Sequence, residues 1–139
     1  MLVELNIIEL PDSGYAEVVP IRALSLDGKC LAINSLDEFR KSKPDDYKKI
    51  MKALSLIRRQ QRVRNPNHVK KCQNRLYPDV YEARAHGGLA RLMFFYHRDN
   101  SGREIAVFTN SFWKNRGDQN QAFTRCDGFR HLFLQYYGK

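Results

Sequence analysis

The chain has 139 residues and carries 24 Lys and Arg against 15 Asp and Glu, which gives a formal net charge of +9. This length predicts one domain, spanning residues 1–139, because domains average about 150 residues. Hydrophobic residues at 42% and aromatic residues at 12% are enough for a buried core, so a disordered basic tail is excluded. The pI near 9.7 favours a polyanionic partner, such as nucleic acid, a ribosomal surface or an acidic protein.

The sequence lacks the features typical of membrane, secreted, metal-binding and nucleotide-binding proteins. No apolar run approaches the ~20 residues of a membrane helix, and the first residues have no basic segment typical of a signal peptide, so we expect a cytoplasmic protein without membrane contact. The three cysteines are far apart and have no metal-ligand spacing, which argues against zinc and disulfides. No nucleotide-binding or hydrolase motif is present. We therefore expect no metal and no cofactor.

The first half of the chain predicts a strand followed by two helices. Residues 15–26 are rich in β-branched side chains and end at a turn signal, Asp27-Gly28. Ser35 and Glu38 have the spacing of a capping box, so a short helix is expected to begin at Ser35 and to stop before Pro44. A second, amphipathic helix is predicted from residue 45 to near residue 64. Its apolar residues recur with the helical period at Tyr47, Ile50, Met51, Leu54 and Ile57.

The second half changes to the two-residue period of strands. Runs at residues 80–84, 90–96 and 105–112 are joined by short connections, which require antiparallel pairing. Residues 119–137 are expected to form a last helix with an apolar side. The predicted fold is α+β, ordered strand, helix, helix, three strands, helix, with the helices on one face of a small, mainly antiparallel sheet.

Ten of the 24 cationic residues fall between Asp46 and Asp79, where no carboxylate occurs. For residues 48–59, a solvated helix face explains the charges as well as a binding surface does. Residues 62–75 mix cations with Asn, Gln and His in an expected loop, which is typical of a surface that contacts phosphates. The RNA-binding cations predicted in this basic tract, residues 47–78, are Arg62, Arg64, Lys70, Lys71 and Arg75.

A tight turn at residues 87–88 sets the register of the first hairpin, with Arg84 opposite Arg91 and Glu82 opposite Met93. The alternate face of these strands is apolar, which places both arginines on an outer, open face of the sheet. Paired like charges need either Glu82 as a bridging carboxylate or an anion between them. The pair is therefore either a surface cluster bridged by Glu82 or a seat for an RNA phosphate.

A further basic segment follows the last strand. Trp113, Lys114 and Arg116 combine an indole with two cations, which suits base stacking and phosphate contact. A core position for Trp113 is the alternative.

The run VYEARAHGGLARLMFFYHRDNSGREIAVFTNSFWKNR resembles the RelE/HigB-type toxin family, including its phage-derived members. The resemblance spans roughly residues 15–137 and is carried by short motifs. It implies N-terminal helices packed on a mainly antiparallel sheet and cleavage of mRNA in the ribosomal A site. It also implies a cognate antitoxin, which we expect to be acidic or a helix-turn-helix protein because the chain is basic.

Within this resemblance, Arg91 matches the strand arginine that contacts the scissile phosphate. Other basic positions of the family are matched by Arg84, Lys114 and Arg116. Glu82 stands where some relatives have lysine, and Phe123 stands roughly where a tyrosine stacks on the substrate base. The best-known catalytic set of the family is therefore incomplete in this chain.

The expected reaction is metal-independent cleavage of RNA, because the RNA 2′-hydroxyl is the nucleophile. The protein then has to hold that hydroxyl in line, remove its proton, stabilise the added charge and protonate the leaving oxygen. The candidate catalytic residues are Arg84 and Arg91 for the phosphate, Lys114 or Arg116 for the leaving oxygen, and His86 or Glu82 as the base.

The main prediction is a type II toxin that inhibits translation as a ribosome-dependent mRNA endonuclease (an mRNA interferase) and docks on ribosomal RNA. A ParE-like toxin that binds DNA gyrase without cleaving RNA is the alternative that the incomplete catalytic set favours. An inactive prophage-derived protein that binds RNA or an antitoxin is the third hypothesis.

Overall fold

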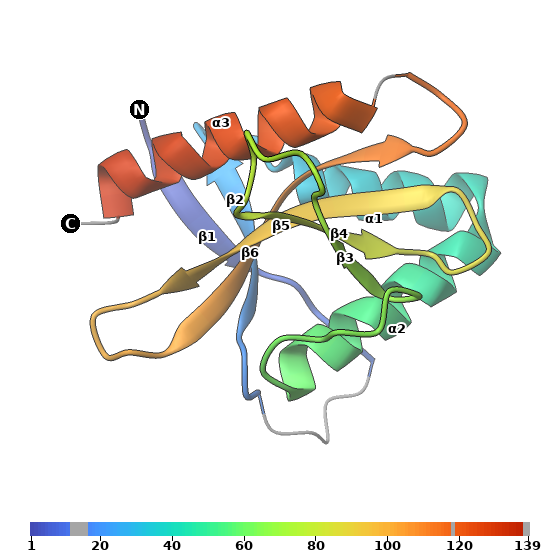
Figure 1. The fold of residues 1–139 in the computed structure, drawn as a ribbon, viewed down its shortest axis with the longest axis horizontal. Coiled ribbons are helices and arrows are strands. Elements are labelled where there is room, and N and C mark those ends of the chain that lie inside the picture. Colours follow the sequence, from blue (N-terminus) through green and yellow to red (C-terminus); the bar gives the residue numbers. More distant parts are fainter. Residues whose placement is uncertain (12–16, 118, 138–139) are drawn as a thin grey trace.

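The computed structural model describes residues 1–11, 17–117 and 119–137, and Figure 1 shows the arrangement of their elements. None of the helices in this part of the chain has the length and apolar character needed to cross a membrane. The elements in chain order are β1 (Val3–Ile7), β2 (Ile21–Leu26), α1 (Leu31–Ser42), α2 (Pro44–Arg59), β3 (Val69–Lys71), β4 (Val80–Arg84), β5 (Ala90–Arg98), β6 (Glu104–Trp113) and α3 (Gln119–Tyr137).

The strands form a six-stranded sheet in the order β1-β2-β6-β5-β4-β3. Neighbouring strands are antiparallel except for β2 and β6, which run parallel. The prediction of an α+β fold with a mainly antiparallel sheet is confirmed. The sequence prediction missed β1 and β3, the two edge strands, because they are short and bury few side chains.

The first predicted strand, residues 15–26, is confirmed from Ile21 to Leu26. Residues 17–20 of that prediction are not part of a strand, and residues 15–16 lie outside the described residues. Asp27-Gly28 forms the expected turn, with Leu26 and Lys29 exchanging backbone hydrogen bonds of 2.9 and 3.0 Å. Both turn residues have positive φ angles, 51° and 81°, which aspartate and glycine accept more readily than most residues do.

The two N-terminal helices cover one face of the sheet (Figure 1). The predicted stripe is confirmed, since Ile50, Leu54 and Ile57 are fully buried against the sheet. Pro44 separates α1 from α2 and occupies the first turn of α2, where its missing N–H has no helical acceptor to lose. Helix α2 ends at Arg59 and not near residue 64, because no residue beyond Ile57 continues the buried stripe.

The predicted capping box at Ser35 is wrong. Helix α1 already begins at Leu31, so Ser35 lies inside the helix and caps nothing. Its hydroxyl lies 2.6 Å from the Ser111 hydroxyl and forms a hydrogen bond that joins α1 to β6. Tertiary packing of this side chain therefore outweighs its local preference for a helix start.

The prediction that all helices lie on one face is also wrong, because α3 covers the opposite face (Figure 1). Phe133 and Cys126 of α3 pack against Met93 and Phe95 of β5 in a second core cluster. This cover closes the face that the sequence predicted to be open. Side chains of β4 and β5 on that face are accordingly buried, and they include Glu82 and Arg91.

Candidate functional site

Three connections lie at one end of the sheet: the α1–α2 corner, the β4–β5 loop and the segment from β6 to α3 (Figure 1). The register predicted for the β4–β5 hairpin is confirmed, with Arg84 opposite Arg91 and Glu82 opposite Met93. The ladder closes at Ala85 and Ala90, so the connection is a four-residue loop, not a two-residue turn. We call residues 85–90 the hairpin loop.

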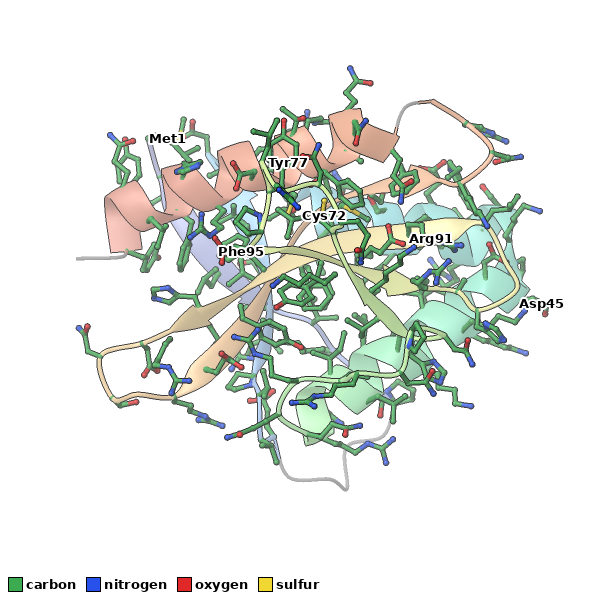
Figure 2. The ribbon with its side chains drawn as sticks, in the orientation of Figure 1. Met1, Asp45, Cys72, Tyr77, Arg91 and Phe95 are labelled. Carbon is green, nitrogen blue, oxygen red and sulfur yellow. The ribbon has the colours of Figure 1, made fainter. Side chains whose placement is uncertain are left out.

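Arg91 lies in the interior of this end of the molecule, on the side of Asp45 (Figure 2), and only 3% of its surface is exposed. Its Nη1 donates to the carbonyl oxygens of Ala85, Gly88 and Ala90 at 3.5, 3.1 and 2.9 Å. Burial lowers the pKa of the Arg91 guanidinium, and the charge of Arg84 lowers it further. Arg91 thus binds the loop backbone and does not project onto an open surface as a phosphate clamp would.

Glu82 is the group that bridges Arg84 and Arg91, which was one of the two alternatives predicted from the sequence. Its Oε1 lies 3.4 Å from Arg84 Nε and 3.8 Å from Arg91 Nε, and its exposure is 2%. Its Oε2 accepts a 3.3 Å hydrogen bond from Gln119 Nε2 at the start of α3. The carboxylate occupies the position between the two arginines where an anion was the other possibility, and its burial removes Glu82 from the candidate bases.

Asp46 holds the hairpin loop from the other face of the sheet. Its Oδ2 accepts hydrogen bonds from the backbone amides of Leu89 and Ala90 at 2.8 and 2.9 Å. A Cβ placed on Gly88 would collide with the same carboxylate, so only glycine fits there without movement. No spacing pattern in the sequence links Asp46, in the first turn of α2, to residues 89–90.

The apex of the hairpin loop brings His86 to a group of exposed cations on α2. A Cβ on Gly87 would lie 3.7 Å from Lys49 Nζ, so Lys49 packs beside the apex. Burial lowers the pKa of His68, and the nearby charges of Lys52 and His86 lower it further. Within the described part of the chain, these four side chains have no carboxylate ion-pair partner. We call Lys49, Lys52, His68 and His86 the histidine cluster.

Arg84 borders the histidine cluster, since its backbone N–H donates to the His68 carbonyl at 2.9 Å. Its Nη1 donates to the Pro66 carbonyl at 2.8 Å, and 23% of its side chain remains exposed. Of the two predicted clamp arginines, Arg84 is therefore the one with access to solvent. His86 was predicted as a candidate residue, but its neighbours Lys49, Lys52 and His68 were not predicted with it, because they come from separate parts of the chain.

The segment after β6 forms a separate basic patch. Trp113 packs edge-on against Phe39 at 5.0 Å between ring centroids and donates to Glu38 Oε1 at 3.4 Å, which favours its core alternative. Arg116 lines a polar hollow of about 340 Å³ together with Arg125 at the start of α3. Lys114 is exposed, and its backbone N–H donates to the Leu89 carbonyl at 2.8 Å. This patch adjoins the hairpin loop but is not part of the histidine cluster.

Among the five predicted RNA-binding cations of the basic tract, Arg62 is bound by a carboxylate of the protein. Arg62 donates to both carboxylate oxygens of Glu104 at 2.9 and 2.7 Å, and its guanidinium lies 4.3 Å from the Tyr96 ring centroid. Burial raises the pKa of Tyr96 to about 12. The other four are exposed and have no carboxylate partner among the described residues: Arg64, Lys70, Lys71 and Arg75.

Lys70 and Lys71 lie on the edge strand β3, where lysines also prevent unwanted strand pairing. Arg64 and Lys71 border a groove of about 420 Å³ that is also lined by Tyr81 and Tyr96. Phe123, in contrast, is a buried residue of α3 with 6% exposure, so its ring is not available to stack on a base.

The described residues contain no group of three or more His, Cys, Asp and Glu side chains that could hold a metal ion. All three cysteines are free thiols; Cys72 and Cys126 are buried, and Cys30 is half-buried.

Comparison with known proteins adds no relative: no family model, no curated protein and no solved structure matches the chain.

Proposed function

We propose that the protein is a RelE/HigB-like type II toxin that cleaves mRNA on the ribosome, with the histidine cluster as its site. The observation that carries the proposal is the convergence of His68, His86, Lys49 and Lys52 from three elements without a carboxylate partner among the described residues. The α+β architecture, with two N-terminal helices on one face of the sheet, agrees with the family resemblance.

Two imidazoles and two ammonium groups are a chemically sufficient set for this reaction. One imidazole in its neutral form accepts the proton of the 2′-hydroxyl, and the other in its charged form donates a proton to the leaving 5′-oxygen. The lysines stabilise the negative charge that develops on the phosphate oxygens. The lowered pKa of His68 favours its neutral form, so we assign the base to His68 and the acid to His86.

The exposed cations of the basic tract extend from this cluster over α2 and β3. Exposed cations of this kind attract the phosphate backbone of ribosomal RNA and bring the protein to the mRNA. We propose a cognate antitoxin with an acidic segment that covers the same surface.

Toeprinting on translating ribosomes tests this function. The wild-type protein should arrest growth and produce new mRNA 5′ ends in the A site, while His86→Ala and His68→Ala should each abolish cleavage. His86 is a better target than Arg91 because it is exposed, so its removal leaves the core intact. Lys29→Ala is the matched control, because it removes one exposed charge at the β2–α1 turn.

Intact mRNA on ribosomes from arrested cells would overturn the proposal. If the same cells contained gyrase trapped on cleaved DNA, the ParE-like alternative would replace it. Intact mRNA without growth arrest would favour a binding protein without turnover.

A further inference from the structure

Within the hairpin loop, the backbone N–H and C=O groups form hydrogen bonds, except those of the two residues at its apex. Besides the bonds from Arg91 and Asp46, Gly88 N–H donates to the Ala85 carbonyl at 2.8 Å, and Lys114 N–H donates to the Leu89 carbonyl at 2.8 Å. Among the described residues, the backbone groups of His86 and Gly87 have no such partner. The loop is therefore fixed at its base and presents two residues at its tip.

Asp46 and Arg91 bind this loop from opposite faces of the sheet. Arg91 shares a strand face with Met93, which packs under α3, whereas Asp46 belongs to α2 on the other face. Arg91 binds only carbonyl oxygens of the loop, and Asp46 binds only its amides. A charged group on each side matches the polarity of the backbone groups that it binds, and such bonds are stronger than neutral ones.

We propose that Asp46 and Arg91 are positioning residues that hold the hairpin loop so that its apex, which carries His86, stays beside Lys49 in the histidine cluster. This inference rests on the proposed function for its catalytic consequence. Neither residue touches the RNA; each acts through the backbone of the loop. The catalytic groups need this support because displacing one by about 1 Å costs up to ~100-fold in rate.

Asp46→Ala and Asp45→Ala form a matched pair for the test. Both substitutions remove a carboxylate from the first turn of α2, but Asp45 is exposed and does not bind the hairpin loop. The helix dipole and the net charge therefore change equally in the two variants. A difference between them reports the bonds from Asp46 to Leu89 and Ala90.

The first readout is NMR on the full-length protein without RNA. In Asp46→Ala, amide exchange at Leu89 and Ala90 should accelerate by ~10-fold or more, because an open loop exposes both N–H groups. The pKa of His68 should rise, because a displaced His86 no longer repels its proton. Asp45→Ala should match the wild type in both measurements.

The second readout is mRNA cleavage on ribosomes, with kcat and KM measured separately. Asp46→Ala should lower kcat by ~10 to 100-fold while KM stays within ~3-fold, because binding by the exposed lysines is retained. Arg91→Lys, which keeps the charge beside Glu82, should recover more activity than Arg91→Ala.

Equal exchange rates and equal His68 titrations in Asp46→Ala and Asp45→Ala would overturn the proposal. If the wild type does not cleave mRNA, the proposed function fails, but the NMR readout still decides whether Asp46 positions the loop. If Asp46→Ala does not fold, Gly88→Ala displaces the same carboxylate and is compared with Gly128→Ala, whose new Cβ meets nothing within 4 Å.

Discussion

Two groups of cations lie at the same end of the sheet and differ in what neutralises them. Arg84 and Arg91 share the buried Glu82 carboxylate, and Arg91 also binds three backbone carbonyls. Lys49 and Lys52, beside the hairpin loop, are exposed and have no carboxylate partner within the described residues. A buried cation has to be neutralised by the protein, whereas an exposed one keeps its capacity to bind an external anion.

The largest expected effect comes from removing the buried cation. Arg91→Met should lower the free energy of unfolding by ~3–5 kcal/mol, because Glu82 would stay buried with only Arg84 beside it. Urea unfolding followed by circular dichroism measures this loss. Arg75→Met, at an exposed position of the basic tract, should change stability by less than ~0.5 kcal/mol. A similar stability for both variants would refute the structural role of Arg91.

The contact between Gly88 and Asp46 gives the next effect. Gly88→Ala should cost ~1–3 kcal/mol, because the added Cβ displaces the carboxylate that accepts from Leu89 and Ala90. Gly128→Ala, within α3, should instead stabilise by ~0.5–1 kcal/mol, since alanine favours the helix and its Cβ has free space. Thermal unfolding compares the two. A destabilisation by Gly128→Ala of the same size would show that the cost at Gly88 is not specific to Asp46.

Substitution of the two exposed lysines of the histidine cluster should weaken RNA binding and leave the free energy of unfolding unchanged. Lys49→Ala combined with Lys52→Ala should weaken binding to single-stranded RNA by ~10-fold at low salt and reduce the salt-dependence slope by ~1.4, at ~0.7 per phosphate contact. Fluorescence anisotropy across a salt series gives both quantities. Lys29→Ala should leave the slope unchanged. If the double variant kept the full slope, the phosphate contacts would have to be assigned to other cations.

The sequence predicted the elements with long periodic patterns and failed where tertiary contacts decide. The stripe of α2 and the register of Arg84 against Arg91 were predictable, because periodicity and a short connection determine them. The burial of Arg91 was not predictable. It results from α3, which covers the sheet face that carries Arg91, and the apolar side of a helix does not show which face of the sheet the helix packs on. Of the candidate site, only His86 could be selected, because its neighbours come from distant parts of the chain.

The smallest expected effect is the pH dependence of stability due to His68. Its pKa in the folded protein lies below the usual value of 6.5, so the unfolded chain binds the proton more readily. Stability should therefore fall as pH decreases through 6.5 toward the folded pKa, and rise again at higher pH. The loss is small because much of the ring remains solvated.

The difference in unfolding free energy between pH 7.5 and pH 5 measures this loss. His68→Gln should reduce the difference, and the part due to His97, whose pKa burial also lowers, should remain. Lys29→Gln is the control, because it changes an exposed side chain at the β2–α1 turn without removing an imidazole. An unchanged pH dependence in His68→Gln would mean that neither burial nor the charges of Lys52 and His86 lower the pKa of His68 in the folded protein. The assignment of His68 as the base would then lose its physical reason.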